Sequence, residues 1–280
     1  MTRRLTTNPL YFQILFLLSG LFAMGQDRII DFKSNFIGQR KIRIYLPEDY
    51  DEAKRRYPVI YMNDAQNLFD AKTSYAGEWR IDETLDSLNA QVIVVGIDHG
   101  NEKRLSELTP FANPEHGGGQ GAKYVNFLID ELMPRINRDY RTRRSRKHTA
   151  IGGSSLGALI SWYAVLEHPR KFGKAILFSP SLWYTDDIFR ITEKQKRIRT
   201  KTYILAGDSE SKGMVPDVER LVDLLSARMR PSDYKLTVVK GGQHNEKLWA
   251  TSFAKAYLWV FEKRRKSTRG AAELYGATAE

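Results

Sequence analysis

Cysteine is absent from this chain of 280 residues, and histidine occurs only five times. Without cysteine the protein has no disulfides, no thiolate metal sites and no cysteine nucleophile. No two histidines have the spacing of metal ligands, so we expect no catalytic metal and no cofactor. Hydrophobic residues make up 42% of the chain, an ordinary share that excludes a wholly disordered or collagen-like protein. Serine-based chemistry remains open.

Long apolar runs are also scarce, and the longest lies near the amino terminus. Arg3 and Arg4 precede an apolar segment from Leu10 to Met24, which is followed by small residues. This order predicts a secretory signal peptide over residues 1–25, with cleavage before Gln26. A retained membrane anchor is disfavoured, because a spanning helix needs about 20 predominantly apolar residues. We therefore expect an exported protein, periplasmic or secreted, with no membrane span after cleavage.

Acidic residues are outnumbered, since 33 Asp and Glu face 44 Lys and Arg, which gives a formal net charge of +11. Much of the excess lies in two runs, at residues 138–147 and 263–269. Such runs contact nucleic acid or anionic lipid in some proteins. Neither run carries the repeated aromatic residues that stack on bases, so we predict no nucleic-acid partner. We interpret the first run as a solvated loop and residues 263–280 as a basic, disordered tail.

Strand-like and helix-like segments alternate along the rest of the chain. Residues 42–46 alternate with period two, whereas residues 58–62 and 92–97 are continuous apolar runs typical of buried parallel strands. Further strand and helix patterns follow at residues 124–136, 149–151, 156–167, 175–178, 202–205, 218–229 and 236–239. They predict an α/β fold, with one domain at residues 26–262 and a mostly parallel sheet covered by helices on both faces. In such a sheet, ligands bind beyond the carboxyl ends of the strands.

A nucleophile motif follows one of these strands. Residues 153–157 read Gly-Ser-Ser-Leu-Gly, which fits Gly-x-Ser-x-Gly when centred on Ser155. The motif stands between the strand at 149–151 and the helix that starts at Leu156, the context of a nucleophile elbow. A sharp turn brings the residues two before and two after the serine close together, which explains the two glycines. Ser155 is therefore the predicted nucleophile.

A serine hydroxyl needs a base to take its proton, and His244 is the histidine in the right position. It follows the last predicted strand, and it comes after Ser155 in the chain, as in the order serine, acid, histidine. The acid should follow the strand at 202–205, where Asp208 and Glu210 both stand. Either carboxylate would orient the imidazole and stabilise its protonated form.

An oxyanion hole needs two backbone N–H groups near the nucleophile. One is expected from Leu156, directly after Ser155. The other is expected from the loop after the strand at 58–62, where Gln66 is the candidate donor. Each such donor is worth roughly 3–4 kcal/mol in acyl transfer.

A glycine-rich segment at residues 117–121 approaches the pattern of a phosphate-binding loop. Ala122 and Tyr124, however, occupy the places of the required glycine and of the serine or threonine. No strand is predicted before it. We interpret the segment as a mobile loop beside the active site.

Taken together, the motifs resemble the Putative esterase family of α/β-hydrolases, which includes siderophore esterases, feruloyl esterases, S-formylglutathione hydrolases and mycolyltransferases. The resemblance covers about residues 30–262. It is carried by YMNDAQNLF (61–69), GEWRID (77–82), ELTP (107–110), GGSSLG (152–157), FSPSLW (178–183), the segment from Gly207 to Glu210, and His244-Asn245-Glu246 with Trp249.

The resemblance implies an α/β-hydrolase fold and a serine esterase that acts on a small-molecule ester. It favours Glu210 over Asp208 as the triad acid. Trp79, Arg104 and Trp183 are expected to line the substrate pocket. A siderophore trilactone is the first substrate class implied, plant-wall feruloyl or acetyl esters the second, and acyl transfer to another acceptor the third. A non-catalytic binding protein on the same fold is the alternative from another class.

Overall fold

The computed structural model describes residues 26–75 and 77–261. The predicted signal peptide, residues 1–25, and the predicted tail, residues 263–280, lie outside this range, so both stay predictions. In the part of the chain that the structure describes, no helix combines the length and the apolar character needed to cross a bilayer.

An eight-stranded sheet forms the centre of the protein, in the order β1-β2-β4-β3-β7-β8-β9-β10. The pairs β1–β2 and β2–β4 are antiparallel, and the remaining neighbours are parallel. The strands are β1 (Gln26–Ser34), β2 (Gly38–Leu46), β3 (Val59–Asn63), β4 (Ile93–Ile97), β7 (Thr149–Ser154), β8 (Lys174–Phe178), β9 (Lys201–Gly207) and β10 (Tyr234–Val239). The expected α/β fold with a mostly parallel sheet is confirmed.

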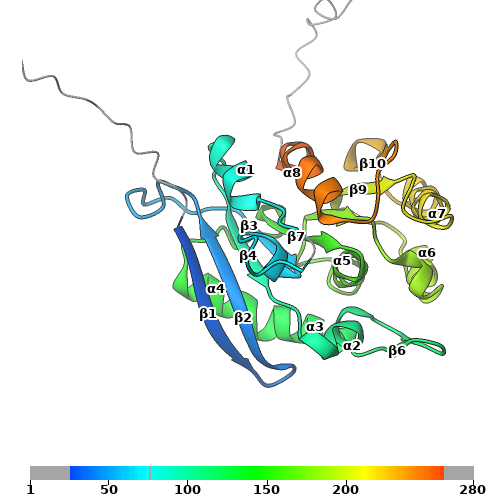
Figure 1. Cartoon of the computed structure of the whole chain (residues 1–280), viewed down its shortest axis with the longest axis horizontal. Coiled ribbons are helices and arrows are strands. Elements are labelled where there is room, and N and C mark those ends of the chain that lie inside the picture. Colours follow the sequence, from blue (N-terminus) through cyan, green and yellow to red (C-terminus); the bar gives the residue numbers. More distant parts are fainter. Residues whose placement is uncertain (1–25, 76, 262–280) are drawn as a thin grey trace, which may run out of the picture.

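Helices cover both faces of this sheet (Figure 1). One face packs against α1 and α8, and the other packs against α3, α4, α5 and α7, so two hydrophobic clusters form. The helices are α1 (Ile81–Ser87), α2 (Arg104–Leu108), α3 (Gly121–Asn126), α4 (Met133–Asp139), α5 (Leu156–Glu167), α6 (Asp187–Glu193), α7 (Met214–Ser226) and α8 (Glu246–Phe261). The strands β3, β4 and β7 are buried along their whole length because both faces are covered.

The glycine-rich segment expected as a mobile loop is a short hairpin instead. It consists of β5 (Ala112–Asn113) and β6 (Gly117–Gly118), which pair antiparallel. Gly117, Gly118 and Gly119 all have positive φ, which glycine adopts without strain. Two hydrogen bonds tie the hairpin to the loop after β8: Asn113 Nδ2 donates to the Tyr184 carbonyl at 2.6 Å, and the Tyr184 hydroxyl donates to the Gly117 carbonyl at 2.5 Å.

Candidate active site

Ser155 lies at the turn between β7 and α5, with φ 55° and ψ −124°, a strained conformation for a non-glycine residue. The turn brings the chain before and after it into contact. A Cβ added to Gly153 would lie 2.9 Å from the carbonyl carbon of Gly157, so a side chain there would force the turn open. The N–H of Ser155 donates to the Phe178 carbonyl at 2.9 Å, which ties the turn to β8. The motif therefore forms the strand–turn–helix geometry that it predicts.

His244 and Glu210 meet at the carboxyl ends of β9 and β10. The His244 Nδ1 atom lies 2.6 Å from Glu210 Oε2. The Glu210 side chain is 1% exposed, whereas that of His244 is 37% exposed. A buried carboxylate on Nδ1 fixes the tautomer of the ring and leaves Nε2 as the nitrogen that can exchange a proton with a substrate.

Asp208, the other carboxylate considered from the sequence, has different partners. Its Oδ1 accepts a hydrogen bond from the Gly241 N–H at 2.7 Å and one from the Ser209 hydroxyl at 3.0 Å. It thus joins the loop after β9 to the loop after β10 and does not contact the imidazole. Of the two candidates, Glu210 is the one that the fold brings to His244.

Sequence reasoning missed the residues that hold Glu210 in place. The Ser179 hydroxyl donates to Glu210 Oε1 at 2.7 Å and accepts a hydrogen bond from Trp249 Nε1 at 2.8 Å. The Trp249 ring lies edge-on to the His244 ring, with centroids 5.1 Å apart. Ser179 and Trp249 belong to segments quoted for the family resemblance, but nothing in their spacing indicates a contact with the acid.

The Ser155 hydroxyl has its hydrogen-bond partner on the same segment as Ser179. Ser155 Oγ lies 3.0 Å from Ser181 Oγ, and the Ser181 N–H donates to the Ser155 carbonyl at 3.1 Å. Within residues 26–75 and 77–261, no hydrogen bond joins Ser155 to His244, although both residues line the same two cavities. Hydrogen bonds between a nucleophile and its base are often loose without substrate.

The two expected oxyanion donors come from different segments, the start of α5 and the loop after β3. Leu156 is the first residue of α5, where backbone N–H groups have no acceptor within the helix. Gln66 lies in the short helical turn η1 (Ala65–Asn67) after β3, and its Oε1 accepts from the His99 N–H at 3.3 Å. Leu156 lines one cavity and Gln66 the other, while Ser155 lines both.

The larger cavity, about 610 Å³, has Trp183, Tyr184 and His116 in its wall. Trp183 is 56% exposed and lines it together with His116 from the β5–β6 connection, and these two rings meet edge-on with centroids 5.5 Å apart. The smaller cavity, about 480 Å³, is lined mainly by polar side chains and includes His99. Chain order excludes His99 and His116 as the base, and the structure places them in the walls of the cavities.

Arg104 lines both cavities and is held by a bidentate ion pair. Its Nε and Nη2 atoms donate to the two carboxylate oxygens of Asp64, at 2.8 and 2.7 Å. Its side chain is 30% exposed and that of Asp64 is 7% exposed. Burial lowers the pKa of Arg104, but Asp64 more than offsets this effect and raises it. A partly exposed guanidinium, fixed by its ion pair with Asp64, therefore stands between the two cavities.

Trp79 does not take the pocket position expected for it. Its side chain is 2% exposed, and its ring stacks on Phe178 with centroids 5.4 Å apart. It also packs against Trp249, with centroids 5.7 Å apart. The large ring fills the core between β8 and α8, because burial of its apolar area stabilises the fold more than a pocket position would.

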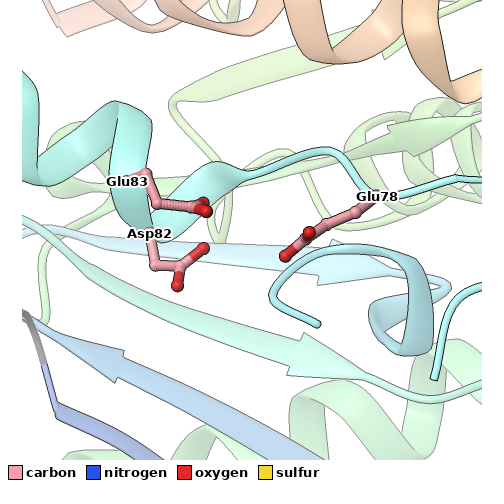
Figure 2. Close-up of side chains that lie close together, drawn as sticks. All are labelled: Glu78, Asp82 and Glu83. Atoms are coloured by element: carbon pink, nitrogen blue, oxygen red, sulfur yellow. The ribbon is translucent and has the colours of Figure 1, made fainter. Parts of the chain in front are cut away.

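A group of three carboxylates lies in the loop before α1 and in its first turn (Figure 2). Glu78, Asp82 and Glu83 have oxygen atoms within 4.8 Å of one another. Arg80 pairs with Glu83 at 3.2 Å, and negative charge is favourable at the amino terminus of a helix. All three side chains are half-buried, and none lines the cavities beside Ser155. The cluster therefore lies at the start of α1, outside the site of Ser155.

A family model described as Putative esterase matches residues 34–260, which include the elbow, both cavities and the loop of His244. The chain belongs to this family. The family assignment and the α/β-hydrolase fold expected from the sequence are therefore confirmed.

Relatives of this esterase differ in what their names say about substrates. An uncharacterized protein, YbbA of Bacillus subtilis, is 25% identical over 82% of this chain and 96% of its own length. Ferri-bacillibactin esterase BesA of the same organism is 29% identical over 50% of this chain and 56% of its own length. Among solved structures, a ferulic acid esterase has a TM-score of 0.63 and 17% identity, covering 85% of this chain and 98% of its own, which shows the shared fold.

Proposed function

We propose that the chain is a serine carboxylic ester hydrolase in which Ser155, His244 and Glu210 form the triad. Ser155 Oγ attacks the ester carbonyl carbon while His244 Nε2 takes its proton, and Glu210 stabilises the imidazolium through Nδ1. His244 then returns the proton to the leaving alcohol oxygen as the ester bond breaks. Water hydrolyses the resulting acyl-enzyme by the same route. The contact of 2.6 Å between His244 and Glu210, at a cavity also lined by Ser155, carries this proposal.

The Leu156 and Gln66 N–H groups serve as the oxyanion donors in this scheme. Negative charge develops on the carbonyl oxygen during attack, and donors that are already fixed stabilise it without reorganisation. Each residue lines a cavity together with Ser155, and Leu156 stands at the amino terminus of α5, which supports the assignment. Ser155 must also turn from Ser181 toward His244 when substrate enters, a rotation about one side-chain bond.

For the substrate, we propose an aromatic, anionic ester of the catecholate trilactone class. Arg104, held by Asp64 and 30% exposed, can offer its remaining guanidinium N–H groups to an anionic ester, and Trp183 and His116 offer aromatic rings in the larger cavity. The name of the relative BesA, a ferri-bacillibactin esterase, supports this class. Feruloyl esters are the second candidate, because the same aromatic wall suits an uncharged phenolic acyl group. Arg104→Gln should weaken kcat/KM for the anionic ester far more than for methyl ferulate if the first class is correct.

We also propose export, with residues 1–25 removed and the mature chain starting at Gln26. The charged, apolar and small-residue order of the first 25 residues supports it. Amino-terminal sequencing of the protein from a bacterial periplasm or medium would test this, since a retained segment would yield Met1 or Thr2 first. A protein found only in the cytoplasm would contradict it.

Fluorophosphonate labelling tests the chemistry directly. We expect a single adduct on Ser155 in the folded protein, mapped by mass spectrometry, and no adduct in Ser155→Ala. Ester hydrolysis should fall by several orders of magnitude in this variant, while the melting temperature is kept. Folded protein that does not label would favour the non-catalytic binding protein, and labelling of Ser154 or Ser181 would show that the wrong serine is named.

A further inference from the structure

Positive charge gathers at the end of the sheet opposite Ser155. Lys174 and Lys201 begin β8 and β9 and are direct partners in the parallel register. Arg146, just before β7, donates through Nε to the Pro169 carbonyl at 2.6 Å and through Nη2 to Thr200 Oγ1 at 3.3 Å. These contacts join three separate segments. We give the name basic face to the surface at this end of the sheet that consists of Arg143, Arg144, Arg146, Lys147, Arg170, Lys171, Lys174 and Arg199.

Acidic side chains do not compensate these charges. In the part of the chain that the structure describes, no residue of the basic face forms an ion pair. The pKa of His148 is lowered by burial and then by the charges of Arg143, Lys147 and Lys174, three members of this face. Residues 143–147, the part of the basic run at 138–147 that lies after α4, thus belong to a larger surface built from three loops.

One rim of the basic face is apolar. Lys174 Nζ lies 5.2 Å from the centroid of the Phe261 ring, and Lys201 Nζ lies 4.4 Å from that of Trp259. Leu258, in the same last turns of α8, is 51% exposed. A cavity of about 610 Å³ opens here, lined by apolar and aromatic residues of α8, by Lys235 and Lys255, and by residues 88–91, which include Asn89 and Gln91. Exposed apolar side chains beside lysines are typical of surfaces that lie at a membrane interface.

We propose that the basic face and its apolar rim dock on an anionic phospholipid bilayer. The positive charges match the negative lipid surface, and Leu258 with the α8 aromatic residues enters the headgroup region. In the sequence, Phe261 and Glu262 are followed by Lys263, Arg264, Arg265 and Lys266, which lie outside the described residues. The phosphates of a nucleic acid would also pair with these positive charges, but they would make no contact that explains the exposed Leu258. Docking on this face turns the cavities of Ser155 away from the bilayer, open to soluble substrate.

Vesicle sedimentation of the full chain tests the proposal. The measured quantity is the gain in affinity for vesicles of equimolar phosphatidylglycerol and phosphatidylcholine over vesicles of phosphatidylcholine alone. The apolar segment Leu10–Met24 can bind to vesicles of either composition, so the difference in affinity measures the contribution of the anionic lipid. We expect Lys147→Gln/Arg170→Gln/Arg199→Gln to reduce the affinity for the anionic vesicles on the order of a hundredfold, because each cation near such a surface contributes about tenfold or less.

Matched controls separate this surface from net charge. Lys33→Gln/Lys41→Gln/Lys123→Gln removes the same charge from exposed positions outside the basic face and should keep the gain. Leu258→Ser should also weaken binding to anionic vesicles, while all variants keep the melting temperature and the ester hydrolysis of the parent. Equal losses in both triple variants would overturn the proposal. A parent protein with no higher affinity for the anionic vesicles would also overturn it. If Leu258→Ser binds anionic vesicles and heparin as tightly as the parent does, the basic face is a general polyanion site and the proposal is wrong.

Discussion

The Ser179 hydroxyl donates to Glu210 Oε1 at 2.7 Å, on the carboxylate oxygen that His244 does not use. Ser179 is fully buried and has φ 46°, so its strained backbone is held by the structure around it. The same hydroxyl accepts a hydrogen bond from Trp249 Nε1, so a buried side chain fixes Ser179, and Ser179 in turn fixes the Glu210 carboxylate. Ser179 is therefore a positioning residue for the proposed triad.

Ser179→Ala should lower kcat/KM by at least tenfold, since a hydrogen bond to a charged group contributes roughly 1.5–3 kcal/mol. With one donor fewer, the carboxylate should hold the imidazolium more strongly and shift the acid limb of the pH–rate profile to higher pH. Trp249→Phe keeps the Ser179–Glu210 bond and should have the smaller effect. A variant with a lower melting temperature but an unchanged pH profile would mean that Ser179 only stabilises the fold.

The choice between the two carboxylates is testable by a pair of isosteric changes. Glu210→Gln should reduce kcat by several orders of magnitude, because an amide on Nδ1 favours the wrong imidazole tautomer. Asp208→Asn should keep most of the activity and lose stability, since Asp208 accepts from the Gly241 N–H and does not contact His244. Steady-state kinetics on p-nitrophenyl acetate would decide. The reverse order of effects would assign the triad acid to Asp208.

Lys174 predicts a pH-dependent stability. Burial, followed by the charge of Lys201, lowers its pKa from 10.5 to about 8. The folded protein then gives up this proton more readily than the unfolded chain, so the destabilisation is fully present below pH 8 and disappears as the pH rises toward 10.5. Lys174→Met should stabilise the fold at neutral pH by about 1 kcal/mol, after discounting for solvent screening.

Thermal unfolding of Lys174→Met and of the parent across this pH range measures the effect. The gain in melting temperature should be a few degrees at neutral pH and should vanish at high pH. Lys147→Gln, an exposed member of the same face, should give no such trend. A gain that is constant with pH would show that packing of the methionine, not the proton, causes it.

Replacement of Gly118 by alanine should reduce both the stability of the fold and the binding of substrate. Its φ is +79°, and a Cβ there would collide with the Thr109 hydroxyl and lie 2.5 Å from the Tyr184 hydroxyl. Gly118→Ala should cost about 1–3 kcal/mol and raise KM, because the hairpin that carries His116 must shift. Gly117→Ala is the matched control, with φ +78° but open space around the added Cβ. Equal effects in the two variants would assign the loss to backbone strain alone.

Much of the site follows from the sequence because the argument depends only on chain order and sheet geometry. Ser155 and His244 each follow a strand of the predicted sheet, and the carboxyl ends of parallel strands meet at one edge. The position of Trp79 could not be predicted this way, since a tryptophan suits a core and a pocket equally and only its neighbours decide. The strand β1 was also missed, because its polar, edge-strand sequence is held by pairing with β2 rather than by its own pattern.

The links between the loops after β9 and β10 have a consequence for heat inactivation. Asp208 accepts a hydrogen bond from the Gly241 N–H, and the Ser209 N–H donates to the Gly242 carbonyl at 3.0 Å. These two bonds join the loop that carries Glu210 to the loop that carries His244. The loop of His244 follows β10, an edge strand that has no fully buried residue. Detachment of this single strand would carry His244 away from Ser155 while the rest of the sheet stays intact. We therefore expect heat to disrupt the site when this edge strand detaches, before the core of the sheet unfolds.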